Sequence, residues 1–92
     1  MTESEISATV LAISGNYAVI HLEGRRYPAL AVQGDSLKIL QEAIEELAGN
    51  LRSGDLKEAG LPLGEIKSTV SAMLSAYEVA ATETGFDLPY AR

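Results

Sequence analysis

The chain has no cysteine, and it has a single histidine among its 92 residues. The absence of cysteine excludes disulfide bonds, thiolate nucleophiles and cysteine-based metal sites. A transition-metal centre needs three or four nitrogen or sulfur ligands, so His21 alone gives no basis for one. Long hydrophobic runs are also missing, and the apolar stretches are far too short to cross a bilayer. We therefore expect a soluble, cytoplasmic protein without metal, cofactor or membrane span.

The usual catalytic motifs are missing as well. The sequence contains no glycine-rich phosphate loop, no nucleophile elbow and no paired metal-ligand motif. As a general base, His21 would need a nucleophile or a carboxylate within reach, and a plain surface histidine on a strand is the commoner case. We predict that the protein is not an enzyme and has no catalytic residues.

Positive charge is scarce. The net charge is −6, divided as −1 over residues 1–33, −2 over residues 34–53 and −3 over residues 54–92. An acidic surface repels phosphate, so we do not expect direct binding to nucleic acid. The acidic excess suits either a merely soluble surface or a basic protein partner, and charge alone does not separate the two.

The length and composition predict one globular domain over residues 1–92. The chain is 47% hydrophobic and 22% charged, which is ordinary for a folded protein. Residues 1–5 are acidic, do not resemble a signal peptide and are expected to be disordered. Residues 86–92 form a tail whose apolar residues we expect to fold back onto the body. A core of this size is modestly stable, so a partner chain or a homodimer is a reasonable expectation.

The first third of the sequence has the alternation typical of strands. Residues 6–13, 17–22 and 27–33 are rich in apolar and β-branched residues, and short segments containing Gly15 and Gly24 separate them. Such turns join neighbouring strands, so the sequence predicts a three-stranded antiparallel meander.

From Gly34 onward the period changes from two to that of a helix. We expect Asp35 or Ser36 to cap this first helix by accepting bonds from its free N–H groups. An apolar stripe follows at three- and four-residue spacing, formed by Leu37, Leu40, Ala43, Ile44, Leu47 and Leu51. Gly49 and Asn50 are expected to fray the helix end.

Residues 52–60 are polar and contain two glycines, so the sequence predicts a loop there. A second helix is expected from about residue 63 to residue 84, ended by Gly85. Its apolar face consists of Ile66, Val70, Met73, Leu74, Tyr77 and Ala81. Two amphipathic helices need an apolar surface to pack on, so we predict an α+β fold of order βββαα, with both helices on one face of the sheet.

The candidate partner-binding residues lie on the face of the sheet that the helices are expected to leave open and on the first helix. We expect residues 18, 20 and 22 to face the helices, which leaves Tyr17, Val19, His21 and Tyr27 outside. Two arginines at the adjoining turn offer anion contacts, and three glutamates on the first helix face away from its apolar stripe. The full set of candidates is Tyr17, Val19, His21, Arg25, Arg26, Tyr27, Glu42, Glu45 and Glu46.

Two segments carry a family resemblance. Residues 15–19 read Gly-Asn-Tyr-Ala-Val, and residues 27–37 read Tyr-Pro-Ala-Leu-Ala-Val-Gln-Gly-Asp-Ser-Leu. With the helix that follows, residues 6–48 resemble the N-terminal unit of the HicB family of antitoxins, or a related family of short bacterial proteins of the immunity type. The sequence departs from that family in residues 38–41, Lys-Ile-Leu-Gln, and in residues 54–92, where the DNA-binding part is absent.

The resemblance implies a non-catalytic protein that sequesters another protein by occlusion, with a basic toxin as the expected partner and a homodimer as a further expectation. Two alternatives stay open at this point. One is a small-molecule-binding protein with a pocket between the sheet and the second helix. The other is a structural homo-oligomer that pairs through the open sheet face.

Overall fold

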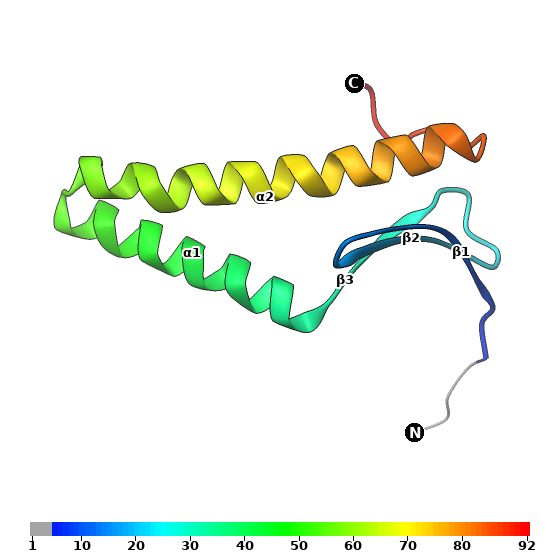
Figure 1. Ribbon diagram of the computed structural model, residues 1–92, viewed down its shortest axis with the longest axis horizontal. Helices are drawn as coiled ribbons and strands as arrows, with labels where there is room; N and C mark the ends of the chain where they lie inside the picture. Colours follow the sequence, from blue (N-terminus) through cyan, green and yellow to red (C-terminus); the bar gives the residue numbers. More distant parts are fainter. Residues whose placement is uncertain (1–4) are drawn as a thin grey trace. The chain divides into compact units, whose positions relative to one another are not determined.

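The computed structural model describes residues 5–92, in which three strands are followed by two helices (Figure 1). The strands β1 (Ala8–Ser14), β2 (Tyr17–Leu22) and β3 (Ala29–Val32) form an antiparallel sheet in the order β1-β2-β3. The helices are α1 (Gly34–Ser53) and α2 (Leu56–Glu83). The predicted α+β fold with a three-stranded meander is confirmed. The disorder expected for residues 1–5 falls mostly on positions 1–4, which lie outside the described residues.

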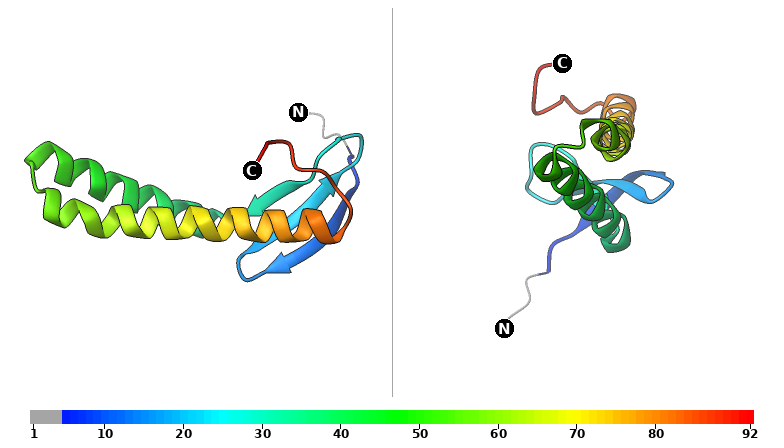
Figure 2. Two further views of the ribbon diagram at one scale, coloured as in Figure 1. Left: turned by 90° about the horizontal axis from the view of Figure 1, so that it is seen from above. Right: turned by 90° about the vertical axis from the view of Figure 1, so that its left-hand side faces the viewer.

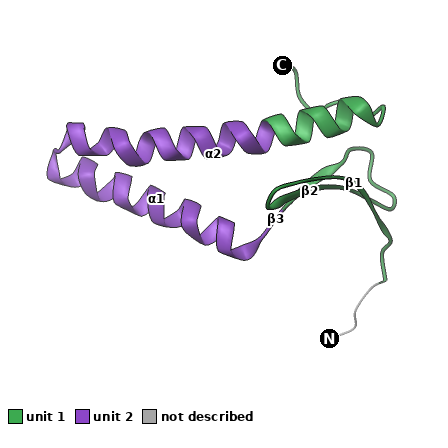
Figure 3. Ribbon diagram, viewed as in Figure 1, with its two compact units in different colours: residues 1–31, 75–92 green, residues 32–74 purple. Residues whose placement is uncertain are grey.

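The chain forms two compact units (Figure 3). The first contains the described residues up to 31 together with residues 75–92, and the second contains residues 32–74. The sheet, the last turns of α2 and the tail thus belong to the first unit. Helix α1 and the longer part of α2 form the second.

In the first unit, β2 has the predicted bounds because glycine turns delimit it on both sides. Gly15 and Gly24 have φ angles of 58° and 80°, which a residue with a side chain rarely adopts. Strand β1 starts two residues later than predicted and contains a β-bulge between Val10 and Ala12. The bulge brings Leu11 and Ala12 opposite the single residue Val19.

The core of the first unit lies on the Val19 face of the sheet. Val19, Tyr77 and Ala80 are buried together, so the last turns of α2 cover this face. The half-buried Leu11, Ala12, Leu30 and Leu88 pack around them. Leu88 belongs to residues 86–92, so the tail folds back onto the body as expected.

The end of α2 is closed by Gly85, as predicted. The N–H of Gly85 donates to the oxygen of Thr82 at 3.3 Å, and the N–H of Phe86 donates to the oxygen of Ala81 at 2.9 Å. This is the Schellman pattern, and it requires the positive φ of 82° that Gly85 adopts. The chain then reverses, which directs the tail back along the first unit.

In the second unit, α1 and the first part of α2 form an antiparallel helical hairpin (Figures 1 and 2). Helix α1 begins at Gly34 after the extended residue Gln33, and it has no side-chain cap. The predicted cap at Asp35 or Ser36 is therefore wrong. Both residues already lie inside the first turn, where the Asp35 carboxylate accepts the N–H of Ser36 at 2.8 Å. The negative charge of Asp35 also interacts favourably with the positive end of the helix dipole.

The connection between the helices is much shorter than predicted. Helix α1 does not end at Gly49 but continues to Ser53, where Gly54 closes it with a φ of 75° and with bonds to the oxygens of residues 50 and 51. Asp55 then caps α2, because its carboxylate accepts the N–H of Glu58 at 3.1 Å. The predicted loop over residues 52–60 is thus wrong, and α2 starts at Leu56 rather than at residue 63.

Candidate protein-interaction surface

The sheet has two apolar faces, and the structure reverses their predicted roles. Pairing places Thr9, Ala12 and Ser14 opposite His21, Val19 and Tyr17, on the face that α2 and the tail cover. Val19 retains only 2% of its exposed surface, so the prediction that it contacts a partner is wrong. Tyr17 and His21 are half-buried on the same covered face.

The opposite face, which we call the outer sheet face, is almost entirely aliphatic. Register and alternation assign to it Ala8, Val10, Ile13, Ala18, Ile20, Leu22 and Ala29. Val10 and Ile13 are 58% and 76% exposed, and the residues of this face in β2 and β3 are half-buried. An antiparallel sheet that covers one face normally presents polar residues on the other. An aliphatic face of this extent is typical of a surface that binds another molecule.

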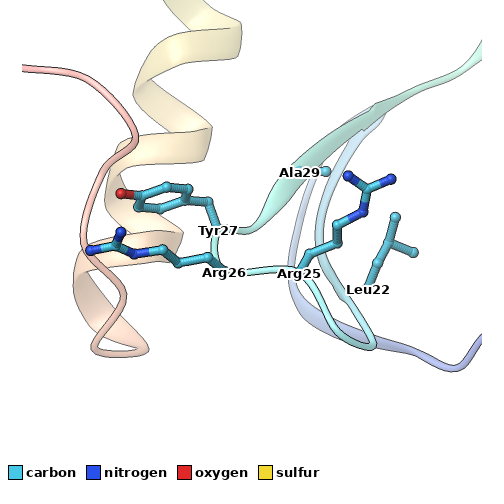
Figure 4. Close-up of a pocket in the computed structure, with 5 residues that line it drawn as sticks. All are labelled: Leu22, Arg25, Arg26, Tyr27 and Ala29. Carbon is cyan, nitrogen blue, oxygen red and sulfur yellow. The ribbon is translucent and has the colours of Figure 1, made fainter.

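Two arginines border the outer sheet face at the turn after β2. A hollow of about 420 Å³ is lined by Leu22, Arg25, Arg26, Tyr27 and Ala29 (Figure 4). Leu22 and Ala29 belong to the outer sheet face, so this hollow continues it. The guanidinium carbon of Arg26 lies 5.1 Å from the centre of the Tyr27 ring, a cation–π distance. Both arginines are exposed, whereas Tyr27 is half-buried.

His21 has a structural role in this arrangement. Its Nε2 lies 2.7 Å from the backbone oxygen of Arg25, which accepts only, so Nε2 carries the proton and donates. Its ring packs against Phe86 of the tail, with 4.7 Å between ring centres. The histidine thereby holds the turn that presents Arg25.

Tyr77 ties α2 to the start of β3. Its hydroxyl donates to the backbone oxygen of Pro28 at 2.7 Å, and both residues are buried. Burial and, to a smaller extent, the nearby Tyr27 raise the pKa of Tyr77 above its usual value. The ring of Tyr90 stacks on Tyr77, with 6.5 Å between ring centres, and its hydroxyl donates to the carboxylate of Glu78 at 2.9 Å. These contacts support the covered face of the sheet and not the outer one.

The space between the sheet and α2 in the first unit is filled. Val19, Leu30, Tyr77 and Ala80 occupy it with their side chains. The small-molecule pocket expected between the sheet and the second helix would have to lie away from these four side chains.

The three glutamates of α1 belong to the second unit. Glu42, Glu45 and Glu46 are all exposed, and the neighbouring Ala43 is buried in the hairpin. They face away from the hairpin interior, as predicted. Over residues 5–92, no group of three or more histidine, aspartate or glutamate side chains is placed to hold a metal ion. Within the same residues, no helix is both long and apolar enough to span a bilayer.

The sequence pattern does not distinguish the outer sheet face from the covered face. Both alternating sets of β2 are apolar, so alternation alone does not reveal which set is covered. The available signal was in β1, where Val10 and Ile13 are large and aliphatic while Thr9 and Ser14, on the covered face, are small and polar.

The fold and this surface define a small α+β protein that combines an open aliphatic sheet face with a helical hairpin. Residues 3–90 match DUF6959, a family of unknown function, and the chain belongs to this family. No curated protein and no solved structure matches the chain.

Proposed function

We propose that the protein is a non-catalytic protein-binding module of the antitoxin or immunity type, which acts by covering the working surface of a partner protein. The observation that carries the proposal is the outer sheet face. Its aliphatic side chains are bordered by arginines, and burying such a face against a partner removes apolar surface from water.

The composition of this surface is that of many protein interfaces. Interface centres are depleted in charge, and arginine is enriched among the residues that contribute most to affinity. Arg25 and Arg26 are exposed at the edge of an uncharged face. A partner that presents an apolar patch next to a carboxylate would satisfy both features, because arginine pairs with carboxylates bidentately.

The acidic helix α1 supports the expectation of a partner that is basic overall. Glu42, Glu45 and Glu46 are exposed and unpaired by any described cation, and they add to a net charge of −6. Such charges accelerate the encounter with an oppositely charged protein without taking part in the final contacts.

The test is a comparison of two valine substitutions of similar exposure in the first unit. Val10 lies on the outer sheet face and is 58% exposed, whereas Val79 lies on α2 and is 53% exposed. The tagged wild-type chain is expected to retain one dominant protein from its host's lysate at near-equal molar ratio. Val79→Lys should retain that protein equally, and Val10→Lys should lose it.

The captured protein must also be neutralised. Expressed alone, it should impair growth or perform a measurable reaction, and co-expression of the wild-type chain should abolish that effect whereas Val10→Lys should not. Equal capture by Val10→Lys and Val79→Lys would overturn the assignment of the surface. A wild-type chain that captures nothing, and whose mass instead falls from oligomer to monomer in Val10→Lys, would identify the outer sheet face as a homo-oligomer contact instead.

A further inference from the structure

Few residues of the helical hairpin in the second unit are fully buried. Its buried residues are Ala43, Ala59 and Pro62, all of them small. Two helices that share so small a contact are marginally stable in water. The hairpin nevertheless carries large aliphatic side chains that stay exposed, and their arrangement is regular.

Both helices follow an unbroken spacing of three and four residues. The positions are Leu37, Leu40, Ile44, Leu47 and Leu51 in α1, and Leu56, Ala59, Leu63, Ile66, Val70 and Met73 in α2. This is the heptad spacing of helices that pack in bundles at small crossing angles. Every second position, the set containing Leu40, Leu47, Ala59, Ile66 and Met73, is buried or half-buried.

The other half of the heptad positions is exposed. This leucine flank consists of Leu37, Ile44, Leu51, Leu56, Leu63 and Val70, with exposures from 40% to 73%. In both helices an exposed residue follows a buried one by four positions, as Ile44 follows Leu40 and Leu63 follows Ala59. Four residues turn a helix by one revolution and about 40° more, so the exposed set is rotated from the buried set in the same sense on both helices.

Equal rotation puts the two exposed sets on the same side of the hairpin. The second helix runs in the opposite direction, which reverses its sense of rotation, and its buried side faces the first helix, which reverses the side to which that rotation leads. Because both reversals apply, the same rotation leads to the same side of the hairpin on each helix. The exposed sets repeat every seven residues from the loop outward, so Leu51 is about level with Leu56, and Ile44 with Leu63. The hairpin therefore has one continuous aliphatic side.

Four glutamates of the hairpin lie on the opposite side, whereas Glu45 directly follows Ile44 and lies about 100° from it around the helix. Each of four glutamates directly precedes a buried or half-buried residue and is thus rotated about 100° in the other sense. These glutamates are Glu42 and Glu46 in α1 and Glu58 and Glu65 in α2. A second copy of this acidic chain is repelled by that side, whereas the leucine flank carries no carboxylate.

We propose that the leucine flank is a dimer interface, covered by the same flank of a second copy about a two-fold axis to give a four-helix bundle. The heptad spacing supplies the packing geometry, and a two-fold axis requires a surface that is complementary to itself. The flank is about 25 Å long and about two helices, or roughly 20 Å, wide, so two copies enclose roughly 1,000 Å², about the minimum expected of a biological interface. This inference is independent of the partner proposed for the outer sheet face.

Sedimentation of the full chain from about 1 to 100 µM tests the proposal, because mass action makes a dimer concentration-dependent. The wild type is expected to sediment at twice its 9.8 kDa mass at the upper concentrations. Ile44→Lys, at the centre of the flank, should weaken dimerisation at least about 100-fold, as an unpaired buried charge does. Its matched control is Ile39→Lys, since Ile39 is exposed on the same helix about 140° away and should change the dissociation constant by less than about threefold.

A labelled chain separates loss of the dimer from loss of the fold. The sequence has no cysteine, so Arg52→Cys with a spin label gives one label per copy. A defined label-to-label distance is expected in the wild-type background, and it should persist with Ile39→Lys and vanish with Ile44→Lys while the helical circular dichroism is retained. A monomer at all concentrations, equal effects of the two lysines, or a dimer broken by Val10→Lys and not by Ile44→Lys would each overturn the proposal.

Discussion

The bond between Tyr77 and Pro28 offers the sharpest test of how the first unit is held together. Tyr77→Phe removes only the hydroxyl, so the ring still fills its place beside Val19 and Ala80. The oxygen of Pro28, which now accepts that hydroxyl at 2.7 Å, then loses its partner in a buried position. A buried acceptor left without a donor costs about 1–3 kcal/mol.

We expect the lower part of this range, about 1–2 kcal/mol, because the ring and its packing are kept. For a chain of this length, each kcal/mol corresponds to about 4–8 °C in the melting temperature. Urea unfolding followed by far-ultraviolet circular dichroism measures the same loss as a lower midpoint at an unchanged slope.

Tyr90→Phe is the matched control. The Tyr90 hydroxyl also donates a bond, to Glu78, but it does so at the surface, where water replaces the lost partner. This substitution should cost less than about 0.5 kcal/mol. If Tyr77→Phe is no more destabilising than Tyr90→Phe, the argument that the buried bond joins α2 to the sheet is refuted.

Three further predictions follow from the same structure. Burial raises the pKa of Tyr77, so the protonated hydroxyl stabilises the fold fully below pH ~10, and this stabilisation is lost as the pH rises through the higher pKa of the folded state. Urea unfolding at a series of pH values should therefore show a steeper alkaline decline of the unfolding free energy in the wild type than in Tyr77→Phe. Equal declines in the two chains would contradict the pKa shift. An added methyl group meets nothing within 4 Å at Gly54 or at Gly60, so backbone conformation decides the effect of alanine at each site. Gly54→Ala should destabilise the fold by about 1–2 kcal/mol because φ is positive there, whereas Gly60→Ala inside α2 should stabilise it by about 0.5–1 kcal/mol. Thermal melts that give both changes the same sign would count against these backbone assignments. Replacing Glu42, Glu45 and Glu46 together by lysine should slow association with a basic partner and reverse its dependence on salt, which stopped-flow mixing measures, and an unchanged rate would exclude steering by α1.

Local signals in the sequence were sufficient to predict the bounds of a strand or a helix where glycine turns delimit it. Strand β2 was predicted with its observed bounds because the glycine turns at Gly15 and Gly24 flank it, and Gly85 ends α2 as expected. The polar residues 52–60 with their two glycines, Gly54 and Gly60, led to the prediction of a loop, since glycine usually weakens a helix. Gly54 instead ends α1, and α2 continues through Gly60 and the buried Pro62.

The candidate site was harder to predict than the fold. Arg25 and Arg26 are exposed beside the surface that we assign, whereas Val19 is at the centre of the core. The error exchanged the two faces of the sheet, because β2 is apolar on both and because a bulge in β1 changes the alternation after Val10. A bulge depends on pairing between strands, so a single strand's sequence does not reveal it.

The first unit is assembled from two distant stretches of sequence, and this has a consequence for synthesis on the ribosome. The strands emerge first, but Tyr77 and Leu88, which cover them, are made roughly 2–11 s after residue 32 at about 5–20 residues/s. Both faces of the sheet are open during that interval, whereas the hairpin of residues 32–74 is one continuous stretch of sequence. The strands are thus made well before the residues that cover them, and the uncovered sheet is the segment that a chaperone would protect.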